Sequence, residues 1–308
     1  MISDLKDGMH VQGQFIVGTA AKSVNNLGSF YLNVELRDAS GTIPAKKWEV
    51  NGDDEQLFTS GNVLFIEGEV VKYREALQLK ILKAAQVDAS DIDFSTLLTP
   101  PPIPRTILEE KFNAYVDSIK NSDCKALLNY FIKKYDNKIF TYPAGVSVHH
   151  EYSSGLLVHL TSMAELGDYL AKKYEPVNRD LLITGILLHD LGKTIELEGP
   201  IVYHYSLEGK LLGHISIMVS DIRMASKELG IDSEVPLLLE HMVLSHHDKP
   251  EFGSPVAPMT KEALLLTLID NMDSKMAIIS KALDGVNEGE FTNKVYPLDG
   301  RTIYKPKK

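Results

Sequence analysis

The chain has 308 residues, of which 44% are hydrophobic and 24% are charged, a composition typical of a folded protein with a sizeable core. It has no run of about 18 apolar residues to span a bilayer, and its first residues lack the pattern of a signal peptide, so we expect a cytoplasmic protein. The single cysteine excludes an intrachain disulfide and a thiolate metal cluster. The net charge of −10 argues against a protein that binds nucleic acid by bulk charge, but it allows a local basic groove.

Residues 1–88 have the pattern of a small β domain. Glycine and Asn-Asn pairs separate five short runs that are rich in β-branched and aromatic residues: 11–19, 29–38, 41–48, 62–71 and 76–83. In the last run Leu77, Leu79 and Ile81 alternate with the residues between them, which is the period of a strand with one buried face. Five short strands in so few residues predict a small closed barrel.

The pattern changes after residue 88. A linker is expected at 89–104, where the proline-rich stretch 99–104 blocks helix formation. Beyond it the apolar residues recur with a helical period, which predicts helices near 106–120, 122–135, 154–174, 178–191, 207–229, 233–246 and 260–283. We therefore predict a two-domain α+β chain with a nearly all-α domain at 105–290 and a short tail at 291–308, basic at its end.

Histidine is concentrated in the helical part, where nine of the ten histidines lie between residues 149 and 247. The stretch 181–191 is apolar on nearly all sides and should be a buried helix, yet it contains His189 and Asp190. A buried imidazole beside a buried carboxylate requires a partner, and a cation is the expected one. Other residues of the right type to join the same site are His159, His214, His246, His247 and Asp270.

These side chains predict a site for divalent metal ions. Imidazole and carboxylate without thiolate point to Mn2+, Fe2+, Zn2+ or a similar divalent ion such as Co2+ or Mg2+. The two oxygens of Asp190 can bridge two ions, and ions about 3.5–4 Å apart suit displacement at phosphorus. The sequence therefore favours a hydrolase that acts on phosphate esters.

The order of these residues resembles that of the HD-domain metallophosphohydrolase superfamily, with His189-Asp-Leu-Gly-Lys193 as its signature. The resemblance implies one ion held by His159, His189, Asp190 and Asp270, and a second held by Asp190, His214 and His246, with His247 as a further candidate. Lys193 is then expected to act on the scissile phosphate, with stabilisation of a helix C-terminus as the alternative. Outside this set, His241 is expected to be structural and Asp273 to support the ligands or to lie on the surface.

A closer resemblance covers nearly the whole chain. The barrel, the proline-rich joint, His149-His150 ahead of His159, and Ser245-His-His247 followed by Gly253-Ser-Pro255 resemble the YhaM-type 3′→5′ exoribonucleases. That resemblance implies an OB-fold domain joined to an HD domain, and manganese-favoured removal of mononucleotides from the 3′ end of single-stranded RNA or DNA. His149 and His150 are then candidates for substrate contact, with packing beside the site as the alternative.

An OB fold binds single strands with basic and stacking aromatic side chains. The candidates on the barrel are Phe30, Tyr31, Lys46, Lys47, Trp48, Lys72, Tyr73 and Arg74, and we select Lys46, Trp48, Tyr73 and Arg74 from them as the predicted contacts. The alternative for Trp48 and Tyr73 is that they fill the barrel or a domain interface. Two rival functions remain at this stage: a phosphodiesterase for small nucleotides or cyclic dinucleotides, and a non-catalytic protein that binds single-stranded nucleic acid. The apolar surface of the helical domain also raises the expectation of a homo-oligomer.

Overall fold

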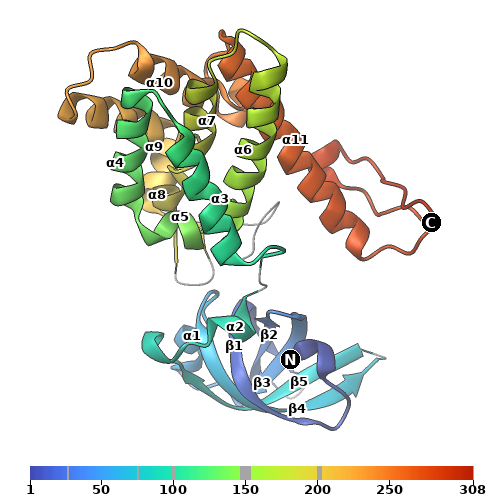
Figure 1. Ribbon diagram of the computed structural model, residues 1–308. Coiled ribbons are helices and arrows are strands. Elements are labelled where there is room, and N and C mark those ends of the chain that lie inside the picture. Colours follow the sequence, from blue (N-terminus) through green and yellow to red (C-terminus); the bar gives the residue numbers. More distant parts are fainter. Residues whose placement is uncertain (26–27, 75, 99–100, 146–153, 200–202, 308) are drawn as a thin grey trace. The chain divides into compact units, whose positions relative to one another are not determined.

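The computed structural model describes the chain except for residues 26–27, 75, 99–100, 146–153, 200–202 and 308 (Figure 1). The chain divides into two compact units, one formed mainly by Met1–Pro100 and the other mainly by Pro101–Lys308. In the described part of the chain, no helix is long and apolar enough to cross a membrane.

The first unit is a closed barrel of five strands. They are β1 (His10–Val24), β2 (Phe30–Asp38), β3 (Gly41–Trp48), β4 (Val63–Tyr73) and β5 (Ala76–Gln86). The neighbours follow the order β1-β2-β3-β5-β4, and the barrel closes because the first half of β1 pairs with β4 while its second half pairs with β2. The β3–β5 pair is parallel and the other pairs are antiparallel. This is the architecture of an OB fold, as predicted.

Alternation along the strands fills the barrel. Leu79 and Ile81 of β5 are buried while Leu82 is exposed, which confirms the predicted inward face of this strand. A short helix between β3 and β4, α1 (Asp54–Leu57), was not predicted, because four residues are too few to show a helical period. The residue that follows it, Phe58, is buried in the barrel core.

Part of the stretch expected to be a linker packs on the barrel. Two short helices, η2 (Ala89–Asp91) and α2 (Phe94–Leu97), follow β5. Leu97 is buried against Ile16 and Val63 in a small apolar cluster of its own. The side chain of Gln14 donates to the carbonyl of Asp91 and accepts the N–H of Asp93. Residues 89–98 therefore extend the first unit, because Leu97, with the partly buried Ile92 and Leu98, packs against Ile16 and Val63 of the barrel.

The second unit is a helical bundle. Its helices are α3 (Arg105–Ser118), α4 (Ser122–Tyr135), α5 (Asn137–Thr141), α6 (Gly155–Lys173), α7 (Arg179–Leu188), α8 (Lys193–Glu196), α9 (Leu207–Glu228), α10 (Val235–Ser245) and α11 (Lys261–Asp284). The strands β6 (Leu197–Glu198) and β7 (His204–Tyr205) pair as a two-stranded antiparallel hairpin. Every residue of α7 from Leu181 to Leu188 is buried, and α7 packs against α4, α6, α10 and α11 (Figure 1).

The seven predicted helices are all present, with ends within three residues of the predicted ones. Polar side chains cap several of them: Asn178 accepts the N–H of Leu181 at the start of α7, Ser206 that of Gly209 in α9, and Thr260 that of Ala263 in α11. The short helices α5 and α8 and the β6–β7 hairpin were not predicted, because each is too short to show a period.

Candidate metal centre

His189 and Asp190 lie directly after the last residue of α7, at the buried end of this helix. Their exposed fractions are 0% and 1%. His189 Nδ1 donates to the carbonyl oxygen of Ile186 at 2.8 Å, which leaves Nε2 available to bind an ion. This Nε2 lies 3.4 Å from Asp190 Oδ2. The apolar helix α7 thus places the side chains of His189 and Asp190 side by side in the interior of the unit.

His159 of α6 and Asp270 of α11 approach the same point. His159 Nε2 lies 3.3 Å from Asp270 Oδ1 and 3.6 Å from Asp190 Oδ2. The other ring nitrogen of His159, Nδ1, donates to Asp273 Oδ2 at 2.7 Å, and Ser162 donates its hydroxyl to the second oxygen of Asp273. Asp273 therefore orients the ring of His159, in agreement with the supporting role expected for it.

His214 reaches Asp190 from α9, with Nε2 3.5 Å from Asp190 Oδ1. Two glycines make this approach possible. Gly213 has a φ of +71°, which kinks α9 just before His214. A Cβ at Gly192 would lie 2.3 Å from the carbonyl oxygen of His214, so the glycine of the His189–Lys193 signature allows the two backbones to touch.

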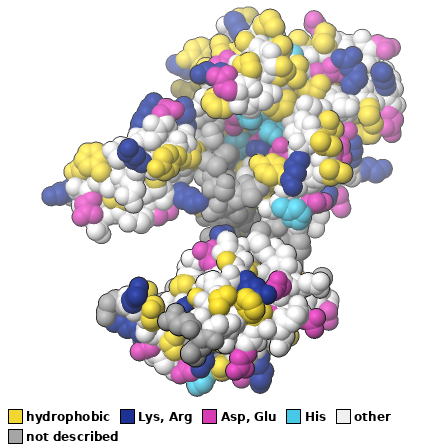
Figure 2. All heavy atoms as spheres, turned by 180° about the vertical axis from the view of Figure 1, so that it is seen from behind, with side chains coloured by type: hydrophobic (Ala, Val, Ile, Leu, Met, Phe, Trp, Pro, Cys, Tyr) yellow, Lys and Arg dark blue, Asp and Glu magenta, His cyan; other side chains and the backbone are white. Residues whose placement is uncertain are grey.

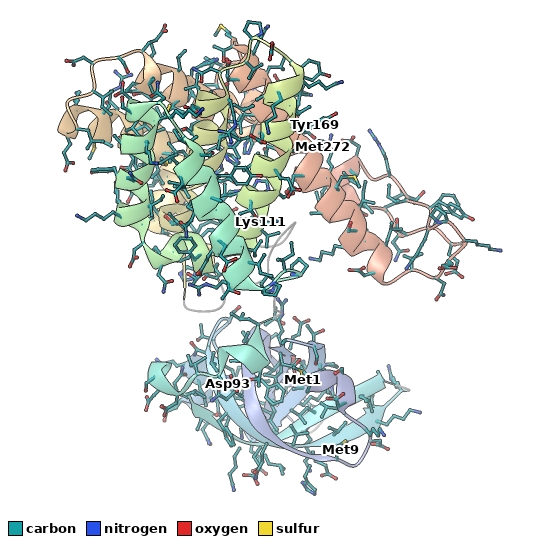
Figure 3. The ribbon with its side chains drawn as sticks, viewed as in Figure 1. Met1, Met9, Asp93, Lys111, Tyr169 and Met272 are labelled. Atoms are coloured by element: carbon teal, nitrogen blue, oxygen red, sulfur yellow. The ribbon has the colours of Figure 1, made fainter. Side chains whose placement is uncertain are left out.

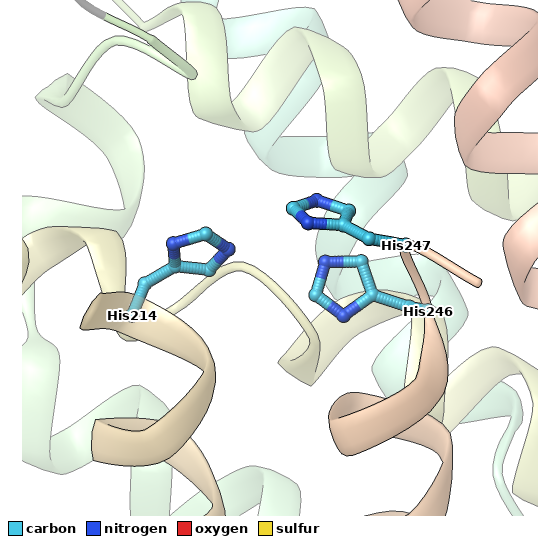
Figure 4. A group of neighbouring side chains, drawn as sticks. All are labelled: His214, His246 and His247. Atoms are coloured by element: carbon cyan, nitrogen blue, oxygen red, sulfur yellow. The ribbon is translucent and has the colours of Figure 1, made fainter. Parts of the chain in front are cut away.

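His246 and His247 follow α10 (Figure 4). His246 Nδ1 donates to the carbonyl of Val243 at 2.7 Å, and its Nε2 lies 3.9 Å from Asp190 Oδ1. His247 Nδ1 donates to the carbonyl of Phe252 at 2.6 Å. One nitrogen from each of His214, His246 and His247 lies within 4.8 Å of the others. The rings of His214, His246 and His247 thus provide a second group of possible ligand atoms, and His214 and His246 face Asp190.

The donor atoms fit divalent ions. Nε2 of His189, His214 and His246 and Oδ1 of Asp190 are buried and have no hydrogen-bond partner among the described residues. Leaving such atoms unsatisfied costs about 1–3 kcal/mol each. Two ligands of one ion with bonds of about 2.1 Å lie about 3.0–3.4 Å apart, close to the separations above. The site thus has the atoms, the spacing and the unmet bonding capacity for metal, with one oxygen of Asp190 facing each group.

The ionisable groups around Asp190 shift one another's pKa values. Burial raises the pKa of this carboxyl, but the Lys193 ammonium and the neighbouring histidines outweigh that effect and hold it well below its usual range. Lys193 Nζ donates to Asp190 Oδ2 at 2.7 Å. Burial lowers the pKa of His159, yet its contacts with Asp270 and Asp273 prevail and raise it to about 9. Burial and the neighbouring histidines lower the pKa of His246.

The predicted metal ligands and Lys193 are therefore brought together in one place, and their ligand roles stay predictions. Figure 2 shows a group of histidine side chains on the helical unit and a further histidine apart from them. His149 and His150 lie outside the described residues. His241, expected to be structural, accepts the backbone N–H of Met259 at 2.9 Å.

Two supporting residues escaped the sequence analysis. The Glu196 carboxylate accepts from His214 Nδ1, with both oxygens at 3.1 Å, and one of these oxygens also accepts the His214 backbone N–H. The hydroxyl of Ser254, which is completely buried, accepts the backbone N–H of His247 at 2.9 Å. A buried acidic residue three positions after Lys193 was a faint signal for the first. Neither contact follows from sequence spacing.

The barrel gathers the four residues predicted to contact nucleic acid. Tyr31 and Trp48 are stacked with ring centroids 4.8 Å apart. Lys46 Nζ lies 5.4 Å from the ring centroid of Trp48 and 5.8 Å from that of Tyr73, and the Arg74 guanidinium lies 5.3 Å from the ring of Tyr73. Trp48 is 38% exposed and Tyr73 56% exposed, so neither fills the barrel.

Comparison with known proteins assigns the family. A family model described as "HD domain" matches residues 156–275, which contain every predicted metal ligand. The 3′-5′ exoribonuclease YhaM of Geobacillus sp. (strain WCH70) is 43% identical over 300 residues, covering 97% of this chain and 93% of that protein. The chain belongs to the YhaM family. Membership confirms the predicted pairing of an OB-like barrel with an HD domain, and it supports a metal-dependent hydrolase.

Solved structures also match the barrel region. The second OB-fold domain of replication protein A from Methanococcus maripaludis is 17% identical, with 29% of this chain and 93% of that chain covered and a TM-score of 0.25. The protein PriB from Ralstonia solanacearum is 16% identical, with 25% and 97% covered and a TM-score of 0.22.

Proposed function

We propose that this protein is a 3′→5′ exoribonuclease that removes mononucleotides from single-stranded RNA with the help of two divalent ions. The observation that carries the proposal is the buried cluster around Asp190, in which one oxygen faces His159 and His189 and the other faces His214 and His246. The near full-length similarity to an exoribonuclease supports the substrate and the direction.

We assign the ligands as the resemblance implies. His159, His189, Asp190 and Asp270 would hold one ion, and Asp190, His214, His246 and His247 would hold the other. Bound in pairs, divalent ions lower the pKa of water and neutralise the charge that develops on a phosphodiester. Mn2+ is the first choice, and Fe2+, Zn2+, Co2+ and Mg2+ are the alternatives to be compared.

Lys193 would contact the substrate phosphate. Its side chain is 12% exposed, and its pKa, lowered by burial, is raised overall by Asp190, so the ammonium stays charged in a buried place. A fixed positive charge beside the ligand cluster can attract a phosphate oxygen and stabilise the additional negative charge of the transition state.

The barrel would bind the single-stranded substrate. Lys46, Trp48, Tyr73 and Arg74 combine two exposed rings with two cations, the combination that binds single strands without sequence preference. We propose single-stranded RNA as the substrate and single-stranded DNA as a second one. The buried, unpaired Cys124 supports a reducing compartment such as the cytoplasm, and we develop a self-associating form below.

The test is degradation of a 5′-labelled single-stranded RNA with added manganese. The wild type should give a ladder that shortens from the 3′ end, and a 3′-blocked RNA should stay intact. Asp190→Ala should be inactive, while Asp232→Ala, which removes an exposed carboxylate, should act as the wild type does. Intact RNA together with hydrolysis of small nucleotides would overturn the proposal in favour of a small-molecule phosphohydrolase.

A further inference from the structure

The last helix of the chain is longer than the core that supports it. α11 runs from Lys261 to Asp284, yet its buried residues are Ala263, Leu266, Thr267 and Ile269, all in its first nine positions. The 15 residues from Asp270 onward form about 22 Å of helix with no buried residue. This part of α11 extends past the other helices of the unit (Figure 1).

One side of α11 carries exposed apolar side chains at a spacing of four residues. They are Leu264, Leu268, Met272 and Met276, with exposed fractions of 49%, 55%, 45% and 56%. We call them the α11 stripe; Met272 is labelled in Figure 3. Residues four apart form one of the ridges by which helices pack against one another. The α11 stripe therefore has the form of a helix-packing surface.

The C-terminal tail does not cover the α11 stripe. Lys305 Nζ donates to the carbonyls of Leu283 and Val286, so the tail is tied to the end of the helix. Within the tail, the rings of Phe291 and Tyr304 contact each other with centroids 5.0 Å apart. These contacts lie beyond the α11 stripe, and its four side chains keep about half of their surface exposed.

We propose that the α11 stripe is the contact surface of a homodimer, in which it packs against the α11 stripe of a second copy of this chain. Ridges of residues four apart interdigitate with identical ridges when two helices cross at about −50°, the commonest packing class. A two-fold axis through this crossing makes the same four side chains contact each other in both copies. Because both copies use the same surface, the dimer requires no other binding surface on the chain.

Charge favours this occupant over a nucleic acid or a charged partner. Helix α11, Lys261–Asp284, contains three lysines and four acidic residues, so its net charge is only −1. The whole chain carries −10. Two copies repel each other over most of their surfaces, but α11, with its nearly balanced charge, can approach its own copy with little repulsion. A polyanion finds no net positive charge there.

The area is of the right order. Each stripe residue exposes on the order of 100 Å², so the four side chains contribute about 400 Å² per copy, half of the roughly 800 Å² per partner in a stable interface. The outer half of α11 adds the partly exposed Ile279 and Leu283, which lie three and seven residues after Met276 and so flank the α11 stripe. Packing of the two outer segments would supply the remainder.

The first test measures the mass of the full chain by sedimentation at tens of micromolar. The wild type should sediment as a dimer of the 34.2 kDa chain. Met276→Glu and the double variant Leu264→Glu/Met276→Glu should be monomers. Met224→Glu replaces a methionine on α9 that is 58% exposed and lies outside the α11 stripe, so it should remain a dimer. A monomeric wild type, or a dimer that both stripe variants retain, would overturn the proposal.

The second test does not depend on disrupting the surface. The only natural cysteine, Cys124, is buried, so Met276→Cys adds a single accessible thiol. Because a two-fold contact brings Met276 near the α11 stripe of its partner, Met276→Cys should form a cross-linked dimer with a short bifunctional thiol reagent, whereas Met224→Cys should stay a monomer on a denaturing gel. Equal cross-linking of both, or of neither, would contradict the assigned surface. Hydrolysis of a small phosphodiester by each variant reports separately on the metal site.

Discussion

Replacing Glu196 by Gln should weaken the binding of one metal ion and leave the other almost unchanged. Both carboxylate oxygens lie 3.1 Å from His214 Nδ1, and the ring can therefore present Nε2 to the ion. Burial raises the pKa of Glu196, but the hydrogen bond from His214 prevails and lowers it, so the carboxylate is charged at neutral pH. The substitution keeps the shape and removes this charge.

The expected loss follows from the support that such partners provide. Removing a carboxylate behind a metal-bound histidine costs roughly 10- to 100-fold in metal affinity, or about 1.4–2.7 kcal/mol. His159 is oriented by a different carboxylate, Asp273, at 2.7 Å, so the ion beside it should keep its affinity. A manganese titration by calorimetry should show one weakened step of the two, and excess manganese should restore the turnover of a small phosphodiester.

The matched control is Glu198→Gln, two residues further along the chain. Glu198 is exposed and its carboxylate lies 3.3 Å from His204 Nε2, outside the ligand cluster. It should bind manganese as the wild type does. Wild-type manganese affinity in Glu196→Gln, or equal losses in both variants, would refute the role assigned to Glu196. An unchanged melting temperature of both metal-free variants would exclude a general loss of stability.

Three further outcomes are expected. Manganese at 100 times its dissociation constant should stabilise the fold by about 2.7 kcal/mol and raise the melting temperature by roughly 5–10 °C, which scanning fluorimetry with and without chelator can measure; Asp190→Ala should lose most of this shift. Because the pKa of His159 is about 9 without metal, an ion must displace a proton below that pH, so the apparent manganese affinity should rise up to about tenfold per unit between pH 7 and 9 and then level off. A manganese affinity that calorimetry finds unchanged between pH 7 and 9 would contradict the displacement of this proton. Trp48→Ala should raise KM for single-stranded RNA about 10-fold or more and leave a small phosphodiester unaffected, whereas Phe65→Ala, which removes another exposed barrel ring, should change neither; equal effects of the two would place the strand elsewhere.

The period of the apolar residues and the composition were enough to predict the main strands and helices of the fold. The alternation around Leu79 predicted a strand with one buried face, and the all-apolar stretch before His189 predicted a buried helix, which α7 is. Elements of two to five residues, such as α8 and the β6–β7 hairpin, cannot show a period and were missed. The stretch 89–98 was assigned to the linker because its composition is polar, although Leu97 buries itself on the barrel.

The sequence by itself determined the chemistry of the candidate site, since the order and type of the histidines and aspartates restrict the site to nitrogen and oxygen ligands for divalent ions. Only the tertiary structure decided which oxygen of Asp190 faces which histidines, that Glu196 holds His214, and that Gly192 must lack a side chain where α9 touches the signature. The physical reason is that sequence patterns carry information only about residues that are close together in the chain. Periodicity reports whether a side chain faces the core, but contacts between residues far apart in the chain depend on how the helices pack.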